Sequence, residues 1–175
     1  MRRIEGWGNT RARLVILGEA PGEREENVGQ PFVGPAGFRL NEWMARVGLS
    51  RADAFIDNVY QHRPAGNAIK SIDRITLEQW MGYLHERISE LDDPWVIVPC
   101  SAAKAEGDHL PASERYTGSF HRLAMATALR ITRPDYVLVA SARYGLLDLE
   151  ADTEPYDLRL DTMSAGPLRR WLSRV

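Results

Sequence analysis

Four short apolar runs, separated by stretches with helical periodicity, constrain the fold of this 175-residue chain more than any other feature. Each run closes on a small or polar residue. Continuous apolar runs of this length are typical of strands that are buried on both faces of a sheet. The strands predicted in this way are 13–18, 54–60, 95–99 and 136–141.

Between the runs, apolar residues recur at the spacing that lets a helix pack one face on a sheet. Such stripes predict three internal helices and a short C-terminal one: 38–47, 77–91, 120–127 and 167–175. Thr76 is the expected N-cap of the second. Strands that alternate with helices predict a three-layer α/β/α sandwich around a central four-stranded, mainly parallel sheet. We expect residues 1–175 to form a single domain.

The cysteine count restricts the chemistry, because Cys100 is the only cysteine. One cysteine cannot form an internal disulfide, a cysteine-based zinc site or a ligated iron–sulfur cluster. We therefore expect no metal site, no metal cluster and no cofactor. The net charge of −2 gives no global basic field for nucleic acid, but it leaves room for a local site.

Targeting signals are also missing from the sequence. The charged N-terminal residues are not followed by the apolar segment of a secretory signal, and no apolar stretch is long enough to span a membrane. The expectation is a cytoplasmic protein that makes no membrane contact.

Polar residues that follow the predicted strands are the first candidates for a site, because parallel α/β folds bind ligands beyond the carboxyl ends of their strands. The first strand leads into a sharp turn made of Gly18, Glu19, Ala20, Pro21 and Gly22. A rigid loop then carries Phe32, and the second strand ends in Asn58. An Asn amide matches the Watson–Crick edge of a pyrimidine, and Phe32 offers a stacking face. Together with the Glu19 carboxylate, they suit a flipped-out base whose sugar is attacked by water.

These segments resemble the uracil-DNA glycosylases of the iron–sulfur type (family 4). The resemblance covers about a third of the chain, in the family's order and spacing, over 18–22, 29–37, 47–51 and 58–67. It implies that Glu19 orients or activates the water, that Phe32 stacks on the base and that Asn58 hydrogen-bonds the edge of the base. DNA, as a duplex or a single strand with a flipped base, is the implied partner. We expect a monomer.

The sequence departs from that family in two places. His62 stands where the family has a cluster cysteine, and no Cys-x-x-Cys precedes the first strand. The family ends its fourth strand in a His-Pro motif, whereas residues 141–147 here read Ser-Ala-Arg-Tyr-Gly-Leu-Leu. We therefore expect different contacts to the base and to the leaving group.

A second group of candidates follows the third and fourth strands: Cys100, Ser101, Lys104, Ser119, His121, Ser141 and Arg143. Residues 96–160 resemble small bacterial and phage proteins of unassigned function. More distantly, they are similar to the archaeosine synthase core, in which equivalent Pro-Cys, Lys, Tyr, Ser and His residues line the site for a deazaguanine base. We expect both groups to converge on one pocket.

Three functions remain open. The first is a DNA glycosylase that hydrolyses the N-glycosidic bond of uracil or of a modified base, such as one of phage DNA. The second is a transferase or lyase that acts through Lys104, because an amine desolvated in a pocket can attack the sugar C1′ and form a Schiff base. The third is a module that reads a modified base without cleaving it.

Each candidate residue also has a purely structural interpretation. Glu19 could only favour a helix dipole, Asn58 could tie down the following loop and Phe32 could belong to the core. The same holds for the second group, where the alternatives are a small apolar filler for Cys100 and a solvated loop residue for Lys104.

The two remaining basic candidates, His121 and Arg143, have structural interpretations too. A satisfied structural histidine is one interpretation of His121. For Arg143, binding of a phosphate or base competes with a surface ion pair to Glu150.

Overall fold

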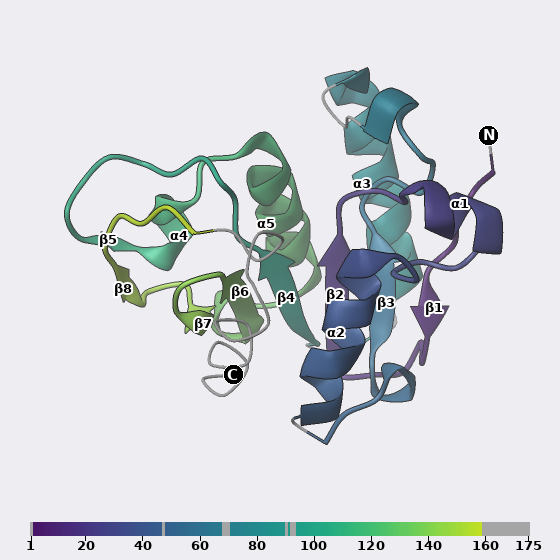
Figure 1. Ribbon diagram of the computed structural model, residues 1–175, viewed down its shortest axis with the longest axis horizontal. Coiled ribbons are helices and arrows are strands. Elements are labelled where there is room, and N and C mark those ends of the chain that lie inside the picture. Colours follow the sequence, from purple (N-terminus) through teal and green to yellow (C-terminus); the bar gives the residue numbers. More distant parts are fainter. Residues whose placement is uncertain (1, 47, 68–70, 90, 92–93, 159–175) are drawn as a thin grey trace.

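The computed structural model describes residues 2–46, 48–67, 71–89, 91 and 94–158, and its centre is a six-stranded sheet (Figure 1). The strand order is β1-β3-β2-β4-β6-β7. The inner strands run parallel to one another, and they are β3 (Phe55–Asn58), β2 (Leu14–Gly18), β4 (Trp95–Pro99) and β6 (Val137–Ser141). These four strands are the predicted ones, which confirms the mainly parallel sheet.

The sheet has six strands rather than the predicted four, because a short antiparallel strand closes each edge. β1 (Trp7–Gly8) pairs with β3, and β7 (Gly145–Asp148) pairs with β6. Strand β1 has only two residues, too few to show a hydrophobic periodicity in the sequence. The strand β7 folds back through a tight turn in which Gly145 has a φ of 87°, a conformation that favours glycine. Residues 141–147 thus form a hairpin.

Two separate cores lie on the two faces of the sheet, as the alternation along β2 shows. Val15 and Leu17 face α3 (Arg74–Ile88) and α5 (Ser119–Ile131), whereas Ile16 faces α2 (Pro35–Arg46). Successive residues of a strand point to opposite faces, so one buried strand serves both cores. Helices on both faces confirm the three-layer α/β/α architecture.

The helix ends differ from the predicted ones. The N-cap of α3 is Asp73, whose carboxylate accepts the Thr76 N–H at 2.9 Å, so Thr76 already belongs to the helix. Two further helices, α1 (Glu23–Val28) and α4 (Ala112–Arg115), are too short for periodicity to reveal. A small antiparallel pair outside the main sheet joins β5 (Leu110–Pro111) to β8 (Asp152–Thr153).

The predicted final helix over 167–175 lies outside the described residues. None of the described helices is long and apolar enough to cross a membrane.

Candidate active site

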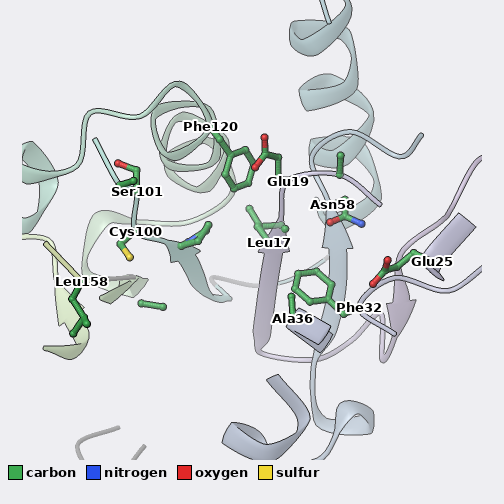
Figure 2. Close-up of a pocket in the computed structure, with 15 residues that line it drawn as sticks. Leu17, Glu19, Glu25, Phe32, Ala36, Asn58, Cys100, Ser101, Phe120 and Leu158 are labelled. Carbon is green, nitrogen blue, oxygen red and sulfur yellow. The ribbon is translucent and has the colours of Figure 1, made fainter. Parts of the chain in front are cut away.

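A cavity of about 500 Å³ lies at the carboxyl ends of the parallel strands (Figure 2). On one side, Glu19 follows β2, Asn58 ends β3 and Phe32 comes from the loop before α2. On the other side, Cys100 and Ser101 follow β4. The structure therefore brings residues of both predicted groups to one cavity, although the two groups lie far apart in the sequence.

The other predicted residues divide into three sets. Gly18 and Ala20 line the same cavity, whereas Pro21 and Gly22 line a neighbouring one of about 190 Å³. Five predicted residues are not among the described residues that line the main cavity: Lys104, Ser119, His121, Ser141 and Arg143.

Hydrogen bonds hold the backbone of Glu19 in place, whereas its carboxylate faces the cavity. The Gly18 and Glu19 carbonyls accept the N–H groups of Val59 and Tyr60 at 2.9 and 3.1 Å, which extends the β2–β3 pairing past the strand ends. In the part of the chain that the structure describes, no group hydrogen-bonds the Glu19 carboxylate. Burial raises the pKa of this carboxyl group above its ordinary value. A carboxylate of raised pKa is a stronger base toward a bound water.

Gly18 marks the place where Phe32 and Asn58 meet strand β2. A Cβ atom at position 18 would lie 2.3 Å from the Asn58 Oδ1 and 2.5 Å from the Phe32 ring, so a larger residue would displace both. Asn58 is buried, yet its side-chain amide has no hydrogen-bond partner among the described residues. Its donors and acceptor are therefore available to a ligand.

Phe32 has a left-handed backbone with a φ of 55°, which is uncommon for a residue other than glycine. Arg51 holds this conformation, because its guanidinium donates to the carbonyls of Pro31 at 2.7 Å and Phe32 at 3.0 Å. Gly37 packs so closely against the Phe32 carbonyl that a Cβ atom at position 37 would clash with it. Local strain of this kind persists only where the surroundings impose it, and it is concentrated at binding sites.

Glu25 joins the two loops of the site, and sequence reasoning missed it. Its buried carboxylate accepts the backbone N–H groups of Gly22 at 3.1 Å, Val33 at 3.1 Å and Gly34 at 2.7 Å. The signal was the position of Glu25 three residues after Gly22, the spacing of a capping box at a helix start. Glu25 thus fixes the turn after β2 and the loop that carries Phe32.

Replacing Glu25 by alanine is expected to destabilise the protein by about 2 kcal/mol or more, because three backbone donors lose their buried acceptor. The measurement is urea unfolding followed by tryptophan fluorescence. Glu23→Ala is the matched control, since Glu23 is exposed and is expected to change stability by less than about 0.5 kcal/mol. Equal small effects of both substitutions would contradict the assigned role.

A buried charge network stands behind Asn58. The Asp57 carboxylate is inaccessible to solvent and accepts hydrogen bonds from the Arg87 guanidinium at 2.6 and 3.0 Å. It also accepts the Gln61 amide at 3.0 Å and the Asn58 backbone N–H at 2.7 Å. Arg3 donates to Gln61 at 2.8 Å. The end of β3 is therefore tied to α3 and to the N-terminal segment.

Two residues of the second group, Lys104 and Ser141, lie in a polar cluster around Tyr156, which belongs to the segment 96–160 that resembles the small bacterial and phage proteins. The Tyr156 hydroxyl lies 2.9 Å from the Ser141 Oγ and 3.0 Å from the Tyr116 hydroxyl. Lys104 Nζ lies 4.2 Å from the centre of the Tyr156 ring and donates to the Ala102 carbonyl at 3.2 Å.

Cys100 and His121 lie near the end of β4, and the buried Nε2 of His121 has no hydrogen-bond partner among the described residues. Burial raises the pKa of the Cys100 thiol, so the neutral thiol is favoured over the reactive thiolate. His121 is buried on α5, and its Nδ1–H donates to the Pro99 carbonyl at 2.7 Å. Burial also lowers the pKa of His121. This histidine ties α5 to the end of β4.

Of Arg143, Ser101 and Ser119, only Ser101 lines the cavity. Arg143 forms an ion pair with Glu154 at 3.2 Å, whereas the surface partner considered from the sequence was Glu150. Ser101 lines the cavity, but its hydroxyl accepts the Gly118 N–H at 3.1 Å and so bridges to the start of α5. Ser119 is exposed at the first turn of α5.

The residues at the expected metal-cluster position do not fit an iron–sulfur cluster. His62, which replaces the family's cysteine, packs on Trp80 with ring centres 5.2 Å apart. Tyr60 and the Arg3 guanidinium contact the same indole at 5.6 and 5.3 Å. Cys100, the only thiol, lies instead at the cavity. Among the described residues, no three His, Cys, Asp or Glu side chains gather as metal ligands would.

Comparison with known proteins gives the family. Residues 5–147 match the model of the uracil DNA glycosylase superfamily. The type-4 uracil-DNA glycosylase of Pyrobaculum aerophilum is 40% identical over 95 residues, which cover 54% of this chain and 47% of that protein. The type-4 uracil-DNA glycosylase of Archaeoglobus fulgidus is 48% identical over 64 residues, 37% of this chain and 32% of that protein.

A third relative, the type-4 uracil-DNA glycosylase of Thermotoga maritima, is 45% identical over 64 residues, 37% of this chain and 33% of that protein. The matched part of the chain thus spans 32–47% of the length of these relatives. The family match is much longer and covers most of the sequence. On that match, the chain belongs to the uracil DNA glycosylase superfamily.

Proposed function

We propose that the protein is a DNA glycosylase that hydrolyses the N-glycosidic bond of a uracil flipped out of DNA. The observation that carries the proposal is the meeting of a half-buried carboxylate, a stacking ring and an unpaired buried amide at one cavity, in Glu19, Phe32 and Asn58. Membership of the superfamily supports the same reaction.

The chemistry follows from the roles of these three side chains. Phe32 stacks on the flipped base, and the Asn58 amide pairs with its edge. Glu19 orients a water and takes up its proton while the water oxygen forms a bond to the sugar C1′. The C1′–N bond breaks, and its electron pair leaves with the base. The products are the free base and an abasic site, and no metal is needed.

A modified pyrimidine is a second candidate substrate. The cavity continues from the Asn58 side past Phe120 to Cys100 and Leu158, so it extends beyond the groups that would hold a pyrimidine ring (Figure 2). A substituent on the base would find a largely apolar wall there. A modified base of phage DNA is one source of such a substrate.

Oligonucleotides that carry a single uracil, thymine or 5-hydroxymethyluracil test the proposal, each as a single strand and as a duplex. We expect alkali-labile sites at uracil and none at thymine, together with binding of each uracil substrate. Cleavage at 5-hydroxymethyluracil would support the wider substrate range. Binding of these DNAs without any abasic site would overturn the proposal in favour of a non-catalytic reader.

We also propose that the protein folds and acts without iron, because its residues do not fit the family's cluster. Protein purified with a chelator is expected to contain less than about 0.1 iron per chain by mass spectrometry and to keep its melting temperature, since a structural metal would contribute its binding energy to folding. Stoichiometric iron, or a melting temperature that falls after chelation, would contradict the expectation.

A further inference from the structure

Breaking the glycosidic bond leaves negative charge on the base, and the described cavity wall offers no cation to balance it. The polar side chains in that wall are Glu19, Glu25, Asn58, Cys100 and Ser101. Two of them are carboxylates, and the Cys100 thiol favours its neutral form. A charge that develops in a cavity of low dielectric constant needs a preorganised partner, because bulk water cannot supply one there.

Lys104 does not itself line the cavity, but its ammonium group is hydrogen-bonded to a residue that does. Its Nζ donates to the carbonyl of Ala102, and Ala102 lines the cavity. The face of the Tyr156 ring lies 4.2 Å from the same nitrogen. A carbonyl acceptor and a π face are both favourable partners of an ammonium group. No other described group hydrogen-bonds Nζ, so a further N–H is available to a ligand.

Two other cationic side chains near the ends of β4 and β6 already interact with other groups. Arg143 is paired with Glu154 at 3.2 Å. Arg115 is inaccessible to solvent, and its guanidinium donates to the carbonyls of Ala105 and Gly107 at 2.8 and 3.0 Å. These contacts hold the segment that follows Lys104 in place.

The position of the Lys104 amine is itself well supported. The backbone of Lys104 forms an antiparallel bridge with Tyr116, and the Tyr116 hydroxyl holds the Tyr156 ring through a 3.0 Å hydrogen bond. Ser141, at the end of β6, holds the same hydroxyl of Tyr156 at 2.9 Å. The ring under the ammonium group is thus anchored to the sheet, and a preorganised charge avoids reorganisation during the reaction.

We propose that Lys104 is a further catalytic residue, whose ammonium group stabilises the negative charge on the departing base. This inference rests on the proposed glycosylase function. It assigns Lys104 an electrostatic role rather than that of a nucleophile, because an ammonium ion has no lone pair with which to attack C1′. In this assignment Lys104 acts on the departing base, whereas Glu19 acts on the water that attacks the sugar.

The test compares uracil with 5-fluorouracil in otherwise identical oligonucleotides, under single-turnover conditions. Fluorine withdraws electrons, so 5-fluorouracil is a better leaving group and depends less on an external cation. Lys104→Met is expected to slow uracil excision by about 10²-fold or more, the size of losing one preorganised charge-stabilising group. It is expected to slow 5-fluorouracil excision by less than about 10-fold. Lys104→Arg, which keeps the charge, is expected to recover much of the uracil rate.

The control variant is Arg13→Met, which removes one exposed positive charge at the opposite edge of the sheet and is expected to leave both rates unchanged. Equal losses on both substrates in Lys104→Met would overturn the inference, because they would indicate a role in folding or DNA binding. Borohydride trapping of the wild type on uracil DNA that disappears in Lys104→Arg would overturn it in favour of a nucleophile. A wild type that excises neither base would instead refute the proposed function itself.

Discussion

Replacing Glu19 by glutamine is expected to slow single-turnover uracil excision by about 10²–10⁴-fold, the usual contribution of a positioned general base. Glutamine keeps the shape of the side chain but cannot take up a proton from water. Glu23→Gln is the matched control, because Glu23 belongs to the same acidic segment but is exposed and lies outside the cavity. Retention of more than a tenth of the wild-type rate by Glu19→Gln would refute the role of Glu19 as the base.

The pH dependence of the rate gives a second signature of Glu19. Burial raises the pKa of its carboxyl group, so the wild-type rate is expected to fall with decreasing pH at a higher pH than an ordinary glutamate would give. Protonation removes the base, and the residual rate of Glu19→Gln should lack this acidic limb. A pH–rate profile of both proteins measures the difference.

The stability of the same variant separates a catalytic from a structural role. A carboxyl group whose pKa is raised by folding binds its proton more tightly in the native state, so its ionised form costs stability above that pKa. At neutral pH, Glu19→Gln removes this cost and is expected to be at least as stable as the wild type in urea unfolding. A clear loss of stability would indicate that Glu19 supports the fold.

Replacing Asp57 by alanine is expected to have the largest effect on stability, a loss of about 3 kcal/mol or more. The substitution leaves the Arg87 guanidinium beside a buried space without its counter-charge, and it also removes the acceptor of the Gln61 amide and the Asn58 N–H. Urea unfolding measures the loss. Asp135→Ala, at an exposed position, is the control and is expected to change stability by less than about 0.5 kcal/mol.

A second substitution tests the cause of that loss. If the uncompensated charge of Arg87 is responsible, Arg87→Met in the Asp57→Ala background should recover part of the stability, because the unpaired cation is then gone. Additive losses in the double variant, or a loss below about 1 kcal/mol in Asp57→Ala alone, would contradict the buried network as the anchor of β3.

The parallel sheet, and the gathering of Glu19, Phe32 and Asn58 at one edge of it, could be predicted because both depend on local sequence. An apolar run between two helical stripes leaves few alternatives to a buried parallel strand. The turn after the first strand and Asn58 at the end of the second must then lie at one edge of the sheet. The edge strands escaped prediction, since the pairing of Trp7 with Ile56 is set by tertiary contact rather than by periodicity.

The residues that support the site could not be singled out in the same way. Glu25 stands among other acidic residues, and only the fold shows that its carboxylate turns inward to three backbone donors. Asp57 interrupts an apolar run without any sign of its partner Arg87, which is 30 residues further on. The contact of Lys104 with the Tyr156 ring likewise joins distant segments. Long-range partners of buried charges depend on the packed structure.

The most direct test of the central claim measures the base that leaves the DNA. A uracil-containing oligonucleotide is incubated with protein prepared in chelator, and free bases are quantified by mass spectrometry alongside abasic sites. The account predicts free uracil in an amount equal to the abasic sites formed, and neither product with Glu19→Gln on the same timescale. DNA that is bound by the protein but releases no free base would contradict it.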